Sequence, residues 1–93
     1  MQIDPPAWWL NRPCPVCDQG SSLVLVACPN CRAIIVVCDE EGSVFPNPRN
    51  LDPISGRGPE DPCPSCGKVA ANHFVLATSD QITEAGFVWG EYA

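Results

Sequence analysis

Hydrophobic positions gather in short runs separated by turn residues. Residues 22–27 (SLVLVA) and 33–38 (AIIVVC) are apolar and rich in branched side chains, and a longer run covers residues 69–77. Short runs of this composition, bounded by turn residues, are typical of strands. The sequence CPNC, residues 28–31, lies between the first two runs. The pattern therefore predicts a hairpin over residues 22–38 with CPNC at its tip, and a third long strand over 69–77.

The remaining segments are shorter and less regular. Residues 43–45 predict a short strand, and residues 46–62 hold five prolines and two glycines, which predicts a loop. A short helical turn is expected over 80–86, with Asp80 as N-cap, followed by an edge strand over 87–92. With 93 residues, the chain fits one domain over 14–93 behind a lead over 1–13 that is rich in proline and tryptophan.

Cysteine content changes this picture most. Of the seven cysteines, six form three Cys-Pro-x-Cys pairs, here called knuckles: Cys14/Cys17, Cys28/Cys31 and Cys63/Cys66. The sequence shows no secretory signal and no membrane-spanning run, so a reducing cytoplasm is the expected location. There, two-residue spacing favours structural zinc, because both thiolates turn toward one tetrahedral ion. An odd cysteine count argues against a disulfide framework, and no crossover helix supports a redox pair.

The knuckles and strands resemble the zinc-ribbon superfamily of small, rubredoxin-like proteins. The match comprises Cys28-Pro-Asn-Cys31, two strands, a variable loop, Cys63-Pro-Ser-Cys66-Gly67 and a strand, over residues 14 to about 79. The resemblance implies a small, metal-stabilised, mostly-β fold with a three-stranded antiparallel sheet and zinc between two knuckles. It implies no catalysis, and it implies a binding module of the kind used in transcription, translation or protein-complex assembly.

The hairpin predicts which cysteines share an ion. The Cys28/Cys31 knuckle at the tip and the Cys14/Cys17 knuckle at the base are too far apart for one zinc, at about 3.3 Å per strand residue. The first site is therefore expected to combine the tip knuckle with Cys63/Cys66. Cys38 follows Cys31 by seven residues and His73 follows Cys66 by seven. Equal spacing predicts a second site at the base, and its ligands would be Cys14, Cys17, Cys38 and His73.

Several alternatives to this second site stay open. Residues 38–42 read CDEEG, a knuckle-like stretch with Glu41 where the second cysteine would stand, so Glu41 could replace His73 as a ligand. Cys14/Cys17 could instead share an ion with Cys28/Cys31. Cys38 could also be a small buried residue without a metal. Two zinc ions are expected, and one at minimum.

Charge and site chemistry narrow the function classes. Zinc with four thiolate ligands leaves no position for substrate, and no catalytic motif is present, so an enzyme is not expected. The chain has five basic and eleven acidic residues and a net charge of −6. Phosphate binding needs clustered basic residues, so nucleic-acid binding in transcription or translation is the second choice.

Terminal aromatic residues point to a protein partner. Trp8, Trp9, Trp89 and Tyr92 lie near the two ends of the chain and are the residue types that dominate protein interfaces when exposed. Their alternative role is to cover the sheet, and neighbouring Trp8 and Trp9 would then face opposite ways. The acidic balance suits a basic partner, for which the protein would be an accessory or an inhibitor of a larger complex.

Overall fold

The computed structural model describes residues 7–12, 14, 23–39, 42–52, 58 and 60–92. Its elements are the strands β1 (Trp9–Leu10), β2 (Leu23–Ala27), β3 (Ile34–Cys38), β4 (Val44–Phe45) and β5 (Val75–Leu76), the helix α1 (Ser79–Glu84), and the 3-10 helices η2 (Ala71–His73) and η3 (Trp89–Glu91). The expected mostly-β fold is confirmed. The sheet has five antiparallel strands where three were expected. Cys17, Glu41 and residues 53–57 of the expected loop lie outside the described residues.

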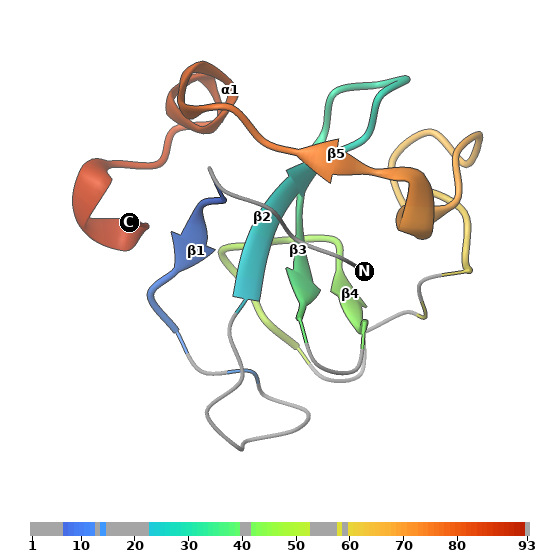
Figure 1. Ribbon diagram of the computed structural model, residues 1–93, viewed down its shortest axis with the longest axis horizontal. Coiled ribbons are helices and arrows are strands. Elements are labelled where there is room, and N and C mark those ends of the chain that lie inside the picture. Colours follow the sequence, from blue (N-terminus) through green and yellow to red (C-terminus); the bar gives the residue numbers. More distant parts are fainter. Residues whose placement is uncertain are drawn as a thin grey trace.

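The predicted hairpin forms the centre of the sheet. β2 and β3 pair antiparallel, with Leu23 opposite Cys38 and Ala27 opposite Ile34. This register puts the CPNC turn at the tip and Cys38 at the base. β4 follows on the outer edge of β3, with Val44 opposite Val37. Figure 1 shows β1, β2, β3 and β4 side by side in this order.

Two short strands share the other edge of β2. β1 pairs with the base half, where Leu10 is opposite Leu23, and β5 pairs with the tip half, where Val75 is opposite Ala27. Leu25 joins the two halves: its N–H donates to the Trp8 carbonyl at 2.9 Å, and its carbonyl accepts from the Ala77 N–H at 3.2 Å. Part of the lead, Trp9–Leu10, therefore belongs to the sheet.

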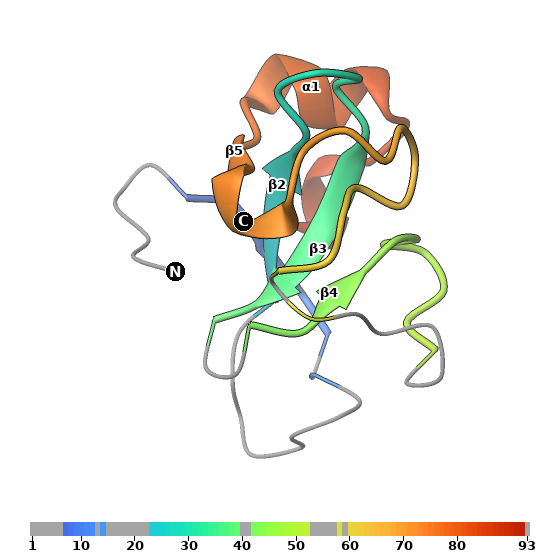
Figure 2. The same ribbon diagram turned by 90° about the vertical axis from the view of Figure 1, so that its right-hand side faces the viewer.

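Both faces of β2 are buried, which explains why its sequence is apolar without alternation. Leu23, Leu25 and Ala27 belong to one core cluster, and Val24 and Val26 belong to a second. The first cluster is covered by Phe45, Ile82, Phe87 and Tyr92, and the second by Cys63, Ala71 and Phe74. Figure 2 shows the central strands between η2 on the near side and the C-terminal segment on the far side.

The prediction of a third long strand over residues 69–77 is wrong. This segment forms η2 and only then the two-residue strand β5. Its start is tied to the preceding loop, because the Ala71 N–H donates to the Asp61 carbonyl at 3.0 Å and Pro62 bridges to Ala70. These bonds turn the chain away from β2, so that only Val75 and Leu76 pair with it. An apolar run does not reveal such competing loop contacts.

Helix α1 confirms the helical turn but corrects its cap. Thr78 is the N-cap: its hydroxyl accepts from the Gln81 N–H at 3.2 Å, and the Gln81 side chain accepts from the Thr78 N–H at 2.9 Å. This reciprocal capping box makes Thr78 the better cap, and Asp80 lies inside the first turn. Gly86 follows the helix with φ 93°, a conformation that glycine adopts without strain.

The prediction of a C-terminal edge strand over residues 87–92 is also wrong. Its centre is the 3-10 helix η3, in which the Glu91 carboxylate accepts from the Val88 N–H at 2.9 Å. Tyr92 alone forms a bridge, to Leu10 of β1. The Asn11 N–H donates to the Glu91 carbonyl at 3.0 Å, so the two ends of the described chain are joined beside β1. No helix among the described residues is long and apolar enough to cross a membrane.

Candidate metal centre

The structure brings four cysteines of two knuckles together. Cys28 and Cys31 come from the β2–β3 turn, and Cys63 and Cys66 come from the loop before η2. Their four sulfur atoms lie within 4.8 Å of one another. The hairpin argument predicted this grouping. The rival grouping of Cys28/Cys31 with Cys14/Cys17 is not the one the structure forms.

The spacing of the sulfurs fits a tetrahedral ion. The Sγ atoms of Cys28 and Cys66 are 3.7 Å apart, and those of Cys31 and Cys63 are also 3.7 Å apart. Four sulfurs at the usual zinc–sulfur distance of about 2.3 Å would be about 3.8 Å from one another in a tetrahedron. The cluster therefore has the donor set and the dimensions of a structural zinc site in which four thiolates bind one ion.

Matching backbone turns hold the two knuckles. The Arg32 N–H donates to the Cys28 carbonyl and the Gly67 N–H donates to the Cys63 carbonyl, each at 2.8 Å. Arg32 and Gly67 have left-handed φ values of 63° and 69°. In the second knuckle, the Cys66 N–H also points at the Cys63 sulfur at 3.5 Å. Such N–H groups stabilise thiolate charge, which metal binding requires.

The thiols of the cluster differ in their readiness to ionise. Burial raises the pKa of Cys28 to about 11. A hydrogen bond from the Asn30 side chain, then one from the Lys68 backbone, lowers the pKa of Cys66 to about 6. The Ala33 backbone lowers the pKa of Cys31. At neutral pH the Cys66 thiolate is ready to bind a cation, while the Cys28 thiol must release its proton to solvent when a metal binds.

Asn30 is a residue of the candidate site that the sequence reasoning missed. It lies in the tip knuckle, yet its side chain acts on Cys66 of the other knuckle. Outer groups of this kind orient the ligands and tune their basicity. The polar residue between the two tip cysteines was the available signal, and only the folded arrangement shows where it reaches.

The residues expected at the second site lie in different places. Cys14 and Cys38 are 2% and 1% exposed and belong to the same core cluster. His73 is exposed and ends η2 two residues before Val75, which pairs with Ala27 at the tip end of β2, whereas Cys38 pairs with Leu23 at the base. Among the described residues, Cys14, Cys38 and His73 do not form a metal-sized group. The complete second site stays a prediction because Cys17 lies outside the described residues.

The terminal aromatic residues pack against one another. Trp8, Trp89 and Tyr92 form three edge-to-face pairs with ring centroids 5.3–5.8 Å apart. Tyr92 is buried, Trp8 is half-buried, and Trp89 is 64% exposed. Trp9 is half-buried on the other face of the sheet, as its neighbouring position predicts. The cluster thus leaves Trp89 exposed while its ring packs against those of Trp8 and the buried Tyr92.

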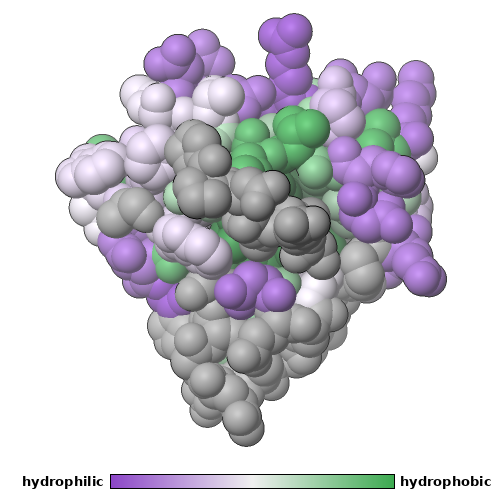
Figure 3. All heavy atoms as spheres, in the orientation of Figure 1, coloured by the Kyte–Doolittle hydropathy of each residue, from purple (hydrophilic) through white to green (hydrophobic). Residues whose placement is uncertain are grey.

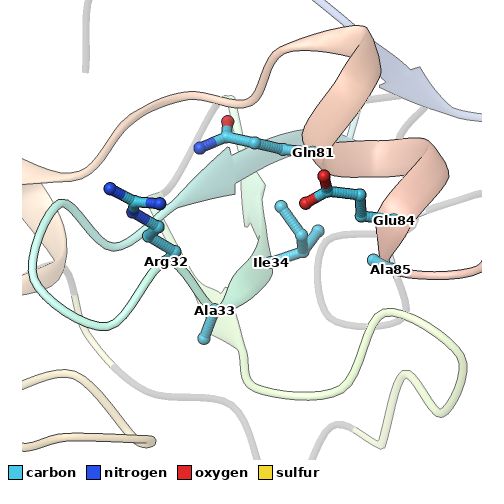
Figure 4. Close-up of a pocket in the computed structure, with 6 residues that line it drawn as sticks. All are labelled: Arg32, Ala33, Ile34, Gln81, Glu84 and Ala85. Atoms are coloured by element: carbon cyan, nitrogen blue, oxygen red, sulfur yellow. The ribbon is translucent and has the colours of Figure 1, made fainter.

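Two pockets lie near these features. One, of about 390 Å³, is lined by Trp8, Leu76, Ala77, Thr78 and Ser79. The other, of about 340 Å³, lies between the residues after the tip knuckle and α1. Figure 4 shows Ile34 pointing toward α1, with Arg32 on one side and Glu84 on the other. This second pocket presents one side chain of each charge and no convergent catalytic groups.

No protein-family model, curated protein or solved structure matches the chain. The site is therefore interpreted from its own geometry. It is a four-cysteine cluster on a small antiparallel sheet, consistent with zinc-binding knuckles.

Proposed function

We propose that this protein is a zinc-stabilised, non-catalytic module that binds another protein. The observation that carries the proposal is a metal centre without a free position, combined with an exposed tryptophan on a rigid support. Four thiolates complete a tetrahedral ion, so the metal holds the fold and leaves no position for substrate. Zinc is the metal that this donor set and spacing favour, and the expected content is two ions, of which the cluster holds one.

Trp89 is the centre of the proposed binding surface. Trp89 and Val88 are 64% and 66% exposed, although both are large and apolar. Trp8 packs edge-on against Trp89 with a centroid distance of 5.8 Å and also lines the 390 Å³ pocket. We call Trp8, Val88, Trp89 and this pocket the aromatic surface. A rigid exposed tryptophan beside a pocket is a typical hot spot, because it buries much area at little entropic cost.

Contacts of the Arg49 side chain hold the segment that carries Trp89 in place. The Arg49 guanidinium lies 2.8 Å from the Glu91 carboxylate, donates to the Gly86 carbonyl at 2.5 Å, and stacks 4.3 Å from the Phe87 ring centre. The Val88 N–H and Arg49 lower the pKa of Glu91, so the carboxylate stays charged at neutral pH. Pre-organisation of this kind reduces the entropic cost of binding.

The negative net charge of the chain favours a partner with a basic surface. The net charge is −6, and Arg49 is already bound within the chain. We therefore expect a protein with a basic surface around an apolar contact, and association that weakens as salt is added. The protein would act as an accessory or inhibitory subunit of a larger assembly.

Capture with the wild-type protein and two variants tests the proposal. Tagged wild-type protein, Trp89→Ala and Val75→Ala would be used to isolate partners from cells of the source. Val75 is the matched control, because it is 50% exposed and apolar but is not one of the residues that form the aromatic surface. Figure 3 shows hydrophobic atoms over the region where Figure 1 places β5. One protein retained by wild type and Val75→Ala and lost with Trp89→Ala would support the proposal.

Affinity measurements with the purified partner then separate the alternatives. Trp89→Ala should weaken binding at least tenfold, which is about 1.4 kcal/mol. Equal binding by Trp89→Ala and wild type would contradict the aromatic surface as the contact. Tight binding to mixed DNA or RNA pools at physiological salt would contradict a protein partner and favour the nucleic-acid alternative.

A further inference from the structure

The pocket between the tip knuckle and α1 has an apolar floor and charged sides. Its volume is about 340 Å³, and it is lined by the chain that leads into β3 and by α1 with its C-cap: Arg32, Ala33, Ile34, Gln81, Glu84 and Ala85. Ile34 is half-buried and points toward α1 (Figure 4). Ligand pockets usually measure about 300–1,000 Å³, so this one has the size for a small ligand.

Arg32 is an unfavourable residue for its position in the tip knuckle. It has a left-handed φ of 63°, and the matching residue of the other knuckle is Gly67, with φ 69°. This conformation is strained for arginine and unstrained for glycine. The Arg32 side chain has no hydrogen-bond or ion-pair partner among the residues that the structure describes. No contact within that part of the chain therefore compensates the strain.

Glu84 is an unfavourable residue for its position in α1. It is the last residue of the helix, and no basic residue lies in the last turn. The C-terminal end of a helix carries partial negative charge, which disfavours a carboxylate there. The Glu84 carboxylate, like the Arg32 guanidinium, lacks a partner within the described ranges. Two locally unfavourable charges on one pocket indicate selection for a ligand rather than for the fold.

Gln81 adds hydrogen-bond donors whose direction is fixed. Its Oε1 atom accepts from the Thr78 N–H at 2.9 Å in the capping box, which leaves the side-chain NH₂ group for another acceptor. Figure 4 shows this nitrogen on the Arg32 side of the pocket and the Glu84 carboxylate on the other side. The pocket therefore has donors at one end, an acceptor at the other, and Ile34 between them.

We propose that this pocket binds a small zwitterion of amino-acid size. The ligand carboxylate accepts from the Arg32 guanidinium and the Gln81 amide, and the ligand ammonium group donates to the Glu84 carboxylate. Its aliphatic part covers Ile34. A ligand with only one charge would leave the opposite charge of the pocket without a partner. The pocket shares no residue with the four-cysteine cluster or the aromatic surface, so this site goes beyond the proposed function.

Titration of isotope-labelled, zinc-loaded protein tests the site by nuclear magnetic resonance. The probes are leucine, whose charged groups are adjacent, and γ-aminobutyrate, whose charged groups are further apart. At least one should shift the amide signals of Arg32, Ile34 and Glu84 saturably. A Kd of about 1 mM or below is expected, because two charged contacts and a small apolar contact support modest affinity. Isocaproate and isoamylamine, which are leucine without its ammonium group and without its carboxylate, should bind much more weakly.

Two variants remove the charges of the pocket without endangering the fold. Arg32→Gly removes a strained side chain, and Glu84→Gln removes a negative charge from the end of α1, so both should be at least as stable as wild type. Each should weaken binding of the zwitterion about tenfold. Glu60→Gln is the matched control, because Glu60 is exposed, has the same charge as Glu84 and does not line the pocket. It should bind as wild type does.

Several results would contradict the proposal. It would be overturned by the absence of a saturable shift with either zwitterion up to about 10 mM. Equal binding of isocaproate or isoamylamine would overturn it too, as would wild-type affinity in both Arg32→Gly and Glu84→Gln. Weaker zinc retention as the only effect of Arg32→Gly would assign Arg32 to the metal cluster instead. Trp89→Ala should bind the zwitterion as wild type does, so a failure here leaves the aromatic surface standing, and the reverse also holds.

Discussion

The two ends of the β2–β3 hairpin carry turns that are closed by the same two backbone hydrogen bonds but differ in sequence. At the tip, the turn begins at Cys28, has Arg32 in the left-handed conformation and places two cysteines in a four-sulfur cluster. At the base, the turn begins at Cys38, has Gly42 in that conformation and has one cysteine. At both ends, the N–H of the first residue donates to the carbonyl of the sixth, and the N–H of the fifth donates to the carbonyl of the first.

This comparison teaches that the knuckle backbone does not depend on a second cysteine. It depends on a residue that tolerates a positive φ and on the hydrogen bonds that close the turn. The residue at the fourth position can therefore differ while these two hydrogen bonds are kept. Metal chemistry and turn geometry are separate properties of the sequence, and each can be altered by its own substitutions.

The largest expected effect comes from removing a ligand at the tip. Structural zinc contributes about 10–16 kcal/mol of apparent binding free energy in small metal-folded peptides, which equals or exceeds the stability of most domains. Cys63→Ser should therefore abolish the cooperative thermal transition. Near-UV circular dichroism, recorded as the temperature rises, measures this transition. Cys38→Ser should keep a cooperative transition at a lower Tm. A wild-type melting curve for Cys63→Ser would show that the tip metal does not hold the fold.

A smaller effect separates turn geometry from ligand chemistry. Gly67 and Gly42 have φ values of 69° and 76°, so replacement by alanine should cost about 1–2 kcal/mol each. Arg32→Gly should do the opposite and stabilise by up to about 1 kcal/mol, because arginine at φ 63° is strained. Chemical denaturation measures these differences.

Gly90→Ala is the control for these variants, because no neighbouring atom lies near its added Cβ and its backbone is not left-handed. It should leave the free energy of unfolding nearly unchanged. If Gly67→Ala is as harmless as Gly90→Ala, the left-handed turn is not what closes the knuckle.

The smallest effect concerns pH at the tip cluster. The Asn30 side chain lowers the pKa of Cys66, so Asn30→Ala should raise that pKa. Protons compete with zinc for the thiolate, and the stability supplied by the metal is present at neutral pH and lost as pH falls. Zinc release on acidification should therefore begin at a higher pH in Asn30→Ala than in wild type. Asn72→Ala, an exposed asparagine in η2, should release zinc as wild type does. Identical release curves for all three proteins would exclude this role of Asn30.

The sequence predicted the hairpin and the tip cluster because both depend on local rules. The apolar runs and the turn at CPNC predicted the hairpin, and the distance between its two ends favoured the grouping of Cys28/Cys31 with Cys63/Cys66 over the rival grouping with Cys14/Cys17. Helix α1 was also predictable, although Thr78 caps it in place of Asp80.

The segment after Cys66 was not predictable, because distant contacts decide it. Ala71 bonds to the Asp61 carbonyl, and the run expected as one strand becomes η2 and β5. The same contacts remove His73 from the base of the hairpin. Likewise, η3 forms because Glu91 folds back onto the Val88 N–H, a contact that an apolar pattern does not record. Equal spacing along the chain is a weak guide when one of the two segments is not a strand.

Metal removal from the wild-type protein tests the central claim most directly. The four-cysteine cluster is the proposed source of the fold's stability, and Trp8, Trp89 and Tyr92 report on it through their packed rings. A strong chelator under reducing conditions should abolish near-UV circular dichroism and the cooperative thermal transition, and added zinc should restore both. Retention of both signals in metal-free protein would contradict the claim that zinc holds this fold.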